Sequence, residues 1–318
     1  MCRVSVVIPN YNGKIYLKDC MEALKGQTFQ DFELIFVDNG STDDSLEYLK
    51  VCYPETRVVQ LSENYGFCRA VNEGVKLSRA EYVILLNNDT KAMPDFIREL
   101  VNTMDDHPSC FSCASHMYKM ADPSKTDDAG DFFCALGWAF ARGKDKPVEA
   151  YRKPGKIFAS CAGAAIYRRK EMVELGLLDE KHFAYLEDID LGYRARIEGY
   201  ENRYEPKAVV YHVGSGTTGS RYNEFKVRYS ARNNLYMIYK NMPLGQIILN
   251  APLLFLGILV KTVFFASKGY GKEYWTGLKL GAELSGEGKK YPFRWKNLGH
   301  YCQIQWELWV NTIRRFSA

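Results

Sequence analysis

The sequence has little that would mark a secreted, fibrous or disordered chain. Its nine cysteines are an odd number scattered over 318 residues without dense spacing, so we expect reduced thiols in a cytoplasm-like compartment. No charged leader precedes the apolar stretch from Val4 to Ile8, and we expect no signal peptide. Low-complexity stretches and internal repeats are missing, and with 25 glycines and 11 prolines the chain is not collagen-like. The sequence predicts a folded protein with one large domain and an appendage, or two moderate domains.

The charge is divided unevenly along the chain. The net charge is +4, but residues 1–220 carry −6 and residues 221–318 carry +10. We therefore predict a first domain over 1–220 and a second, basic region over 221–318 that faces an anionic neighbour. The basic region mixes its cations with long apolar stretches and contains no recognised nucleic-acid module, so no nucleic-acid partner is expected.

Short apolar runs alternate with amphipathic stretches in the first hundred residues, which indicates an α/β fold with a mostly parallel sheet between helices. Strands are predicted at Val4 to Pro9, Phe32 to Asp38, Arg57 to Leu61 and Tyr82 to Leu86, and helices at Ile15 to Lys25, from Ser45, at Phe67 to Lys76 and from Pro94. Residues 105–170 read as added strands and loops. A helix at Asp188 to Glu198, a strand at Tyr204 to Tyr211 and an almost continuous helical pattern from Tyr222 follow.

A polar, turn-prone loop follows each of the four predicted parallel strands. The loops are Asn10-Tyr11-Asn12-Gly13, Asp38 to Asp43, Glu63 to Gly66 and Asn87-Asn88-Asp89. Because ligands bind at the carboxyl ends of the strands in open α/β sheets, these loops are expected to form the ligand site.

These segments resemble the family 2 glycosyltransferases of GT-A fold, which have a Rossmann-like sheet. The resemblance rests on the order of several motifs: Val6 to Asn12, Gln27-Thr28, Phe36 to Asp43, Leu85 to Asp89, Tyr185 to Leu191 and Tyr211 to Ser215. It covers roughly residues 4 to 215. Within the family the chain is most similar to bacterial rhamnosyltransferase-like members that build surface polysaccharide. The implied function is inverting transfer of a sugar, with rhamnose favoured, from a nucleotide sugar.

The resemblance assigns nucleotide-sugar binding to the first loops. It puts Tyr11 against the base, Asp38 on the base or ribose and Asn64 nearby, while Pro9 shapes the turn. The predicted donor is dTDP-rhamnose first and a UDP-sugar second. The alternative is that Asp38-Asn39-Gly40 is only a favourable turn and Tyr11 a surface aromatic. Three such loops on strand ends favour the binding site.

Asn87-Asn88-Asp89 stands where the family has Asp-x-Asp, with Asn replacing the first carboxylate. Asp89 still offers a hard oxygen ligand for Mg²⁺ or Mn²⁺, and Asn87 can hydrogen-bond ribose without adding charge. His212 stands where family members often place a second metal or diphosphate ligand. The glycine-rich segment 214–219 is expected to close on the nucleotide, with Arg221, Lys226 or Arg228 near the diphosphate. The alternatives are that Asp89 caps a helix and that His212 is structural.

Glu187-Asp188 resembles the Glu-Asp motif of the family. Inverting transfer needs a carboxylate that takes the proton of the acceptor hydroxyl, and Asp188 is the predicted base. Glu187 is predicted to position the acceptor or share that role. The alternative is an acidic first helical turn stabilised by the helix dipole, which suits Asp190.

Two further groups have open interpretations. Small residues from Cys161 to Ala165 mark either an approach for the acceptor or a tightly packed strand. His107, Cys110, Cys113 and His116 are spaced three apart, but a strand over Cys110 to Ser115 would point the two thiols to opposite faces, which disfavours zinc.

The basic region predicts the acceptor and the location of the protein. Residues 247–266 are mostly apolar, and aromatic residues and cations alternate after them, as at a lipid headgroup boundary. We predict helices over 244–316 on the anionic inner face of the cell membrane. This placement would hold the site near the polyprenyl-diphosphate-linked or other glycan acceptor that the family resemblance implies. The alternative is a helical homodimer interface or a cap over the sheet.

Three other functions were weighed. A sugar nucleotidyltransferase would need a Gly-rich loop with Arg after the first strand, which Asn10 to Gly13 is not. Processive members carry Gln-x-x-Arg-Trp, whereas Tyr291 stands before Arg294-Trp295 in the place of Gln. A non-catalytic subunit binding lipid or a partner is the main alternative, and intact Asp89, Asp188 and His212 argue against it.

Overall fold

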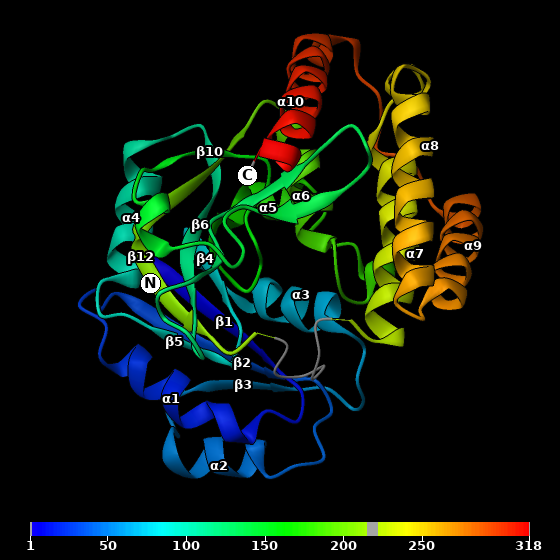
Figure 1. The fold of residues 1–318 in the computed structure, drawn as a ribbon. Helices are drawn as coiled ribbons and strands as arrows, with labels where there is room; N and C mark the ends of the chain where they lie inside the picture. The colour runs from blue at the N-terminus through cyan, green and yellow to red at the C-terminus, as the bar shows by residue number, and fades with distance from the viewer. Residues whose placement is uncertain (1, 215–221, 318) are drawn as a thin grey trace.

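A computed structural model of the chain describes residues 2–214 and 222–317. Its strands and helices alternate as the sequence predicts in the first hundred residues (Figure 1). The strands are β1 (Val4–Asn10), β2 (Phe32–Asp38), β3 (Arg57–Gln60), β4 (Tyr82–Leu86), β5 (Thr90–Ala92), β6 (Cys110–Lys119), β7 (Thr126–Asp128), β8 (Asp131–Phe133), β9 (Ala139–Ala141), β10 (Gly155–Ile157), β11 (Ala164–Arg168) and β12 (Glu201–His212). The α-helices are α1 (Lys14–Lys25), α2 (Ser45–Cys52), α3 (Phe67–Leu77), α4 (Phe96–Asp106), α5 (Arg169–Glu174), α6 (Glu187–Ile197), α7 (Glu224–Asn241), α8 (Leu244–Ser267), α9 (Gly271–Glu287) and α10 (Leu298–Ser317).

The predicted α/β sheet is confirmed. Strands β3, β2, β1 and β4 run parallel in that order, so their carboxyl ends meet at one edge. The sheet continues through β11, which is antiparallel to β4 and β6, and through β12, which is parallel to β6. The middle of the chain supplies this second half, and β5 is a short strand that the sequence did not predict.

Alternating side chains of the strands build a core on each face of the sheet. Val6 and Ile8 of β1 point to the face covered by α1, α2 and α4, while Val7 points to the face covered by α3, α5 and α6 (Figure 1). Both faces are therefore buried, as expected for strands that read as continuous apolar runs.

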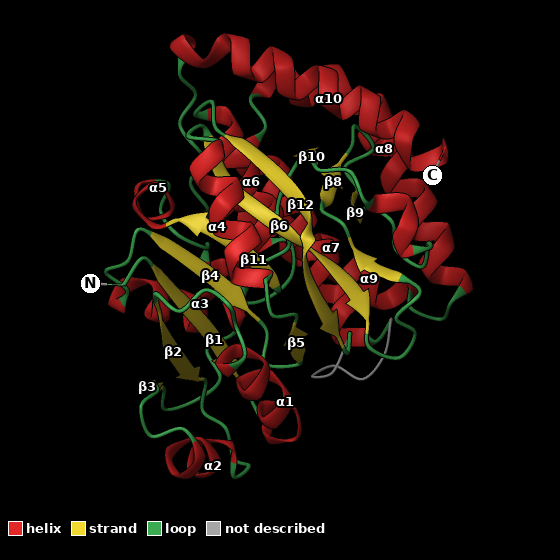
Figure 2. Ribbon diagram, turned by 90° about the vertical axis from the view of Figure 1, so that its left-hand side faces the viewer, coloured by secondary structure: helices red, strands yellow, loops and turns green. Residues whose placement is uncertain are grey.

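Helices α7 to α10 confirm the helical C-terminal region, and they pack on the first domain. A third core joins Phe133 and Tyr193 to Met237 of α7 and Leu308 of α10. Figure 2 shows α10 lying along one side of the molecule beside the short β8–β9 hairpin. Residues on both sides of the predicted boundary at 220 thus share one apolar cluster.

The residues of the weighed zinc site do not gather. Cys110 and Cys113 lie buried on β6, and their thiols contact backbone carbonyls of Ser112 and Ala114. His116 shares a hydrogen bond with Thr126. In residues 2–214 and 222–317, the grouping suited to a metal by proximity is Asp128, Asp131 and Cys161 instead.

Candidate active site

A cavity of about 790 Å³ opens at the carboxyl ends of the parallel strands. The loops after β1, β2, β3 and β4 supply one wall, and the start of α6, the β8–β9 hairpin and the end of β12 supply the other. The residues predicted from the sequence that line it are Pro9, Tyr11, Asn64, Asn87, Asn88, Asp89, Glu187, Asp188, His212 and Lys226. Pro9 and His212, 203 positions apart in the sequence, therefore border one space.

Asp38 and Arg228, both predicted to lie near the nucleotide, do not line the cavity. Asp38 is buried, and its carboxylate accepts hydrogen bonds from the Asn10 side chain at 3.2 Å and from the Ser41 N–H at 3.2 Å. Asn39 lines the cavity in its place, and its amide donates to the Asn64 side chain at 2.9 Å. Asp38 thus joins the loop after β1 to the loop after β2 through these hydrogen bonds. Arg221 and most of the 214–219 segment lie outside the described residues.

Asp89, His212 and Asp127 form a line of contacts across the cavity wall. Nε2 of His212 lies 3.3 Å from Oδ1 of Asp89, and Nδ1 lies 2.8 Å from Oδ2 of Asp127, which also pairs with Lys144. Burial alone would lower the pKa of His212, but its hydrogen bonds to both carboxylates raise it to about 9. Burial opposes ionisation of Asp127 too, yet His212 and Lys144 lower its pKa to about 2.

The turn that leads into α6 is held in an unusual backbone shape. Phe183, Tyr185 and Leu186 have φ values of 63°, 75° and 66°, a region that costs energy for residues with side chains. The buried Asn233 amide of α7 donates to the carbonyls of His182, Ala184 and Tyr185 at 2.8 to 2.9 Å. One side chain therefore fixes the turn that aims the start of α6 at the cavity.

Asp188 and Glu187 begin α6 at the cavity wall. The Asp188 carboxylate accepts from the N–H of Ile189 at 2.8 Å and faces the N–H of Ala162 at 3.4 Å. Burial raises the pKa of Asp188 above its ordinary value. Burial and the neighbouring Asp188 charge raise the pKa of Glu187 to about 8, and its buried Oε2 has no hydrogen-bond partner among the described residues. Both carboxyls hold protons more tightly than free ones, which suits proton acceptance near neutral pH.

Glu187→Gln should weaken the dependence of thermal stability on pH. Because the pKa of Glu187 is raised on folding, the folded state binds more protons than the unfolded state between the ordinary pKa and about 8, so stability falls as pH rises through that window. Thermal melting of ligand-free protein from pH 6 to 9 should show wild type losing stability, and the variant losing less and melting higher at pH 9. The exposed Glu55→Gln is the matched control. Parallel curves for wild type and Glu187→Gln would show that the Glu187 pKa is not raised.

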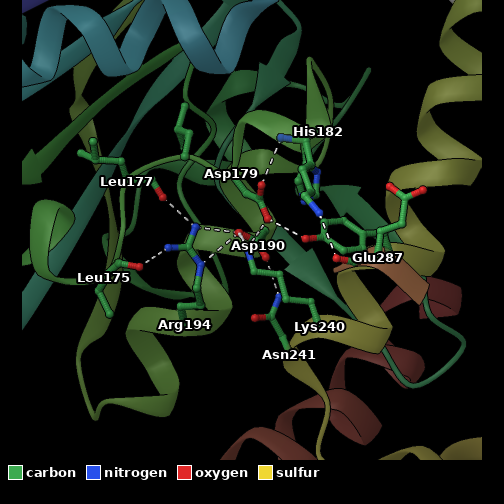
Figure 3. A network of polar contacts seen from close by, with 12 residues as sticks. Leu175, Leu177, Asp179, His182, Asp190, Arg194, Lys240, Asn241 and Glu287 are labelled. Atoms are coloured by element: carbon green, nitrogen blue, oxygen red, sulfur yellow. Dashed lines mark hydrogen bonds and ion pairs between the residues drawn. The ribbon is translucent and has the colours of Figure 1, made fainter. Parts of the chain in front are cut away.

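Asp190, two residues after Asp188, faces the opposite way into a buried ionic network (Figure 3). Its carboxylate contacts Arg194 Nη2 at 2.6 Å, Lys240 Nζ at 2.9 Å and Asn241 Nδ2 at 2.8 Å. Burial would raise the pKa of Asp190, but these charges hold it far below its usual range. Asp190 therefore joins α6 to α7 and does not reach the cavity, in keeping with the structural role expected for it.

Three acidic residues of the cavity were missed by the sequence reading. Asp127 supports His212, while Asp128 and Asp131 lie beside Cys161 on the far wall. Burial raises the pKa of Asp128 to about 7. Their signal was three acids within five residues, directly before the apolar run that begins at Phe132, and it could have marked a site. Gly163 of the small-residue segment lines the cavity as well, close to the Asn87 amide.

The fold and the cavity define an α/β protein with a candidate ligand site at the carboxyl ends of its parallel strands, and comparison with known proteins gives the family. Residues 5–175 match the family model described as glycosyl transferase family 2, which is more than half of the chain. The chain belongs to glycosyl transferase family 2.

Two curated relatives illustrate the similarity. The chain is 26% identical over 239 residues to an N-acetylglucosaminyl-diphospho-decaprenol L-rhamnosyltransferase of Mycobacterium tuberculosis, covering 67% of this chain and 77% of the relative. It is 32% identical over 184 residues to glycosyltransferase GlyG of Streptococcus pneumoniae, covering 57% of this chain and 60% of the relative. The resemblance to rhamnosyltransferase-like members of the family is thereby confirmed.

Two solved structures share the fold. GalNAc-T7 with UDP, GalNAc and Mn²⁺ aligns with a TM-score of 0.61 at 17% identity, covering 75% of this chain and 48% of that chain. S. aureus TarS 1-349 with UDP-GlcNAc aligns with a TM-score of 0.56 at 15% identity, covering 92% of this chain and 94% of that chain. The predicted GT-A fold is confirmed, and the protein is a glycosyltransferase.

Proposed function

We propose that this glycosyltransferase transfers rhamnose, with inversion, from dTDP-rhamnose to a hydroxyl of a polyprenyl-diphosphate-linked glycan during surface polysaccharide synthesis. A UDP-sugar is the second choice of donor. The observation that carries the proposal is that Asp89, His212 and Asp188 border one cavity with the loops of the parallel strands. The name of the mycobacterial relative supports rhamnose and a lipid-diphosphate acceptor.

In the proposed reaction, Asp188 takes the proton of the acceptor hydroxyl while that oxygen attacks the anomeric carbon. The nucleoside diphosphate leaves from the opposite face of the sugar, which inverts the configuration. Two backbone N–H groups hold the Asp188 carboxylate in place. Its raised pKa makes it a stronger proton acceptor than an ordinary aspartate carboxylate. Glu187, buried beside it, positions the acceptor. Tyr11 and Asn64 hold the nucleotide, supported from behind by Asp38.

The residues beside Asp89 fit a divalent cation. A carboxylate oxygen and an imidazole nitrogen that face each other across 3.3 Å are a donor pair for Mn²⁺ or Mg²⁺, and Asp127 orients the imidazole as carboxylates do behind metal-bound histidines. Asp89 and His212 would hold the ion, with Asn87 and Asn88 beside it. When bound, the ion neutralises the diphosphate leaving group.

Asp89→Ala should remove most of the metal-dependent gain in donor affinity, and His212→Ala should remove less of it, because the carboxylate carries the charge. Asp127→Asn should lower Mn²⁺ affinity by about 10- to 100-fold through the orientation of His212. Donor binding measured by calorimetry with and without Mn²⁺ checks this order. Asp95→Ala, an exposed acid of the same segment, is the control. Full activity of wild type in excess chelator would remove the metal from the proposal.

The donor is tested by measuring binding and slow hydrolysis of nucleotide sugars by the purified protein. Binding of dTDP-rhamnose or a UDP-sugar, with release of the nucleoside diphosphate, is expected. Binding of purine nucleotide sugars alone would contradict the proposed donor. A chain that neither binds nor hydrolyses any of them would be the non-catalytic subunit.

We also propose that the C-terminal helices rest on the inner face of the cell membrane. Among the described residues, one helix, α8, is long and apolar enough to cross a membrane by length and composition, and little of it is buried. The exposed apolar side chains that support the proposal are Ile248, Phe255, Leu259 and Val263 of α8 and Trp306, Ile313 and Phe316 of α10. A surface of this kind is typical of membrane or protein contact.

Phe255→Glu with Leu259→Glu should abolish flotation with anionic vesicles, because it places charge on the apolar face of α8. Wild type should float at low salt. The control, Ile15→Glu with Val51→Glu, changes exposed apolar residues of α1 and α2 and should float as wild type does. If wild type floats with no vesicle composition and instead forms a dimer that the α8 variant dissociates, the apolar face is a dimer interface.

A further inference from the structure

The β8–β9 hairpin connects the cavity to the C-terminal helices. Phe140 of β9 lines the cavity. The other end of the hairpin lies between α8 and α10 (Figure 2): the Trp138 indole donates to the Gly257 carbonyl of α8 at 3.2 Å, and Asn311 of α10 donates to the Phe133 carbonyl at 3.0 Å. A Cβ at Gly257 would stand 2.1 Å from the Leu136 carbonyl oxygen, so the approach of α8 requires glycine.

Three cations surround this hairpin on the same two helices. Lys261 lies one turn after Gly257 and places its ammonium 5.7 Å from the Trp138 ring centre. Arg315 lies one turn after Asn311 and stands 5.7 Å from the Phe140 ring centre, and Arg314 stands 5.2 Å from that of Phe132. Residues four apart share a helix face, so Lys261 lies on the same face of α8 as Gly257. In the same way, Arg315 lies on the face of α10 that contacts the hairpin through Asn311.

These cations lack acidic partners. None of the three forms an ion pair with a carboxylate in residues 2–214 and 222–317, unlike Lys144, Arg194 and Arg196. Burial lowers the pKa of Lys261 to about 8, and the positive charge of Arg315 adds to this lowering. Like charges held together on aromatic faces are stabilised when an anion binds between them.

We propose that Lys261, Arg314 and Arg315 bind the diphosphate of the polyprenyl-linked acceptor, beside the β8–β9 hairpin. This inference rests on the proposed function. The acceptor sugar would enter the cavity past Phe140 toward Asp188, while the polyprenyl chain would follow the exposed apolar faces of α8 and α10. The cluster lies outside the donor loops, so a second phosphate-bearing substrate can bind while the donor is present.

The position of these three cations favours binding of the acceptor diphosphate over non-specific binding of anionic lipid headgroups. Arg315 stands on the ring of Phe140, whose side chain lines the cavity, so a phosphate held there is tied to a sugar within reach of the site. Lys261 belongs to the face of α8 that turns to the hairpin, not to the face of Phe255, Leu259 and Val263 that is exposed. A bulk lipid headgroup would meet that exposed face first.

The test is calorimetric binding of farnesyl diphosphate in chelator, with no donor present. Wild type should bind it, and Lys261→Gln with Arg315→Gln should bind at least about tenfold more weakly, since two charge-assisted contacts are lost. Lys18→Gln with Arg79→Gln makes the same charge change at exposed cations of the first domain and should bind as wild type does. Farnesol, which lacks phosphate, should not bind.

Three outcomes would overturn the inference. Wild type fails to bind farnesyl diphosphate, or the cluster variant binds it as tightly as wild type, or the control variant loses as much affinity as the cluster variant. Loss of binding to phosphatidylglycerol vesicles by the cluster variant, with farnesyl diphosphate binding unchanged, would assign the cations to bulk lipid instead. Because no donor is used, failure here is distinct from failure of the proposed transfer, which donor hydrolysis measures separately.

Discussion

Asp188→Asn should lower the rate of glycosyl transfer by about 10²- to 10⁴-fold while donor affinity stays the same. The amide cannot accept the proton of the acceptor hydroxyl, and it keeps the size of the side chain at the start of α6. In wild type, kcat/KM should fall toward acid with an apparent pKa above that of an ordinary aspartate, because burial raises the pKa of Asp188. Initial rates from pH 4 to 8 measure both effects.

Two controls limit the interpretation of Asp188→Asn. Its melting temperature should equal or exceed that of wild type near pH 8, since the change removes a charge that burial disfavours. Titration with the nucleoside diphosphate should give an unchanged affinity. Near-normal turnover would rule out Asp188 as the base, and Glu187 would be tested next.

Asp190→Asn should destabilise the fold by about 3–5 kcal/mol, although it lies only two residues away in the same motif. The change leaves Arg194, which is 2% exposed, and Lys240 near each other without the carboxylate that both contact. Urea unfolding at pH 7 measures the loss. In wild type this contribution is present above the ordinary pKa of aspartate and is lost as the pH falls below it, because the pKa of Asp190 is lowered on folding.

Asp190→Asn separates a structural role from a catalytic one. At temperatures where the variant is folded, its turnover should stay far closer to wild type than that of Asp188→Asn. The exposed Asp44→Asn, whose partner Lys14 is solvent-accessible, should leave the free energy of unfolding close to that of wild type. A stability equal to wild type for Asp190→Asn would show that the network of Figure 3 contributes nothing to folding.

The sequence predicts the fold and the donor half of the cavity because their signals are local. The strand at Tyr82 to Leu86 matches β4 residue for residue, and polar loops follow strands whose carboxyl ends must share an edge. The predicted roles of the lining residues stay predictions until variants are measured. The Asp38 carboxylate is buried and accepts hydrogen bonds from Asn10 and Ser41, a placement that the sequence does not reveal, and its predicted contact with the nucleotide stays a prediction.

The other half of the cavity could not be read because its signals are long-range. Asp127 matters through His212, which lies 85 positions away, and no periodicity marks the short strands between Lys119 and Arg168. The partners of Asp190 on α7 are 50 positions distant. Pairings of this kind depend on how the helices pack, which a single sequence does not reveal.

The hydrogen bonds from Asn233 of α7 to the turn before α6 limit where the chain can be truncated. A chain truncated at residue 220 would keep every residue that lines the cavity except those of α7, but it would lose the amide that ties down the carbonyls of His182, Ala184 and Tyr185. The strained turn before Glu187 would then relax, and Glu187 and Asp188, the predicted catalytic residues, would no longer be held toward the cavity. A chimera that replaces the C-terminal helices with those of a relative is therefore expected to change turnover as well, unless the replacement begins after Asn241, the last residue of α7.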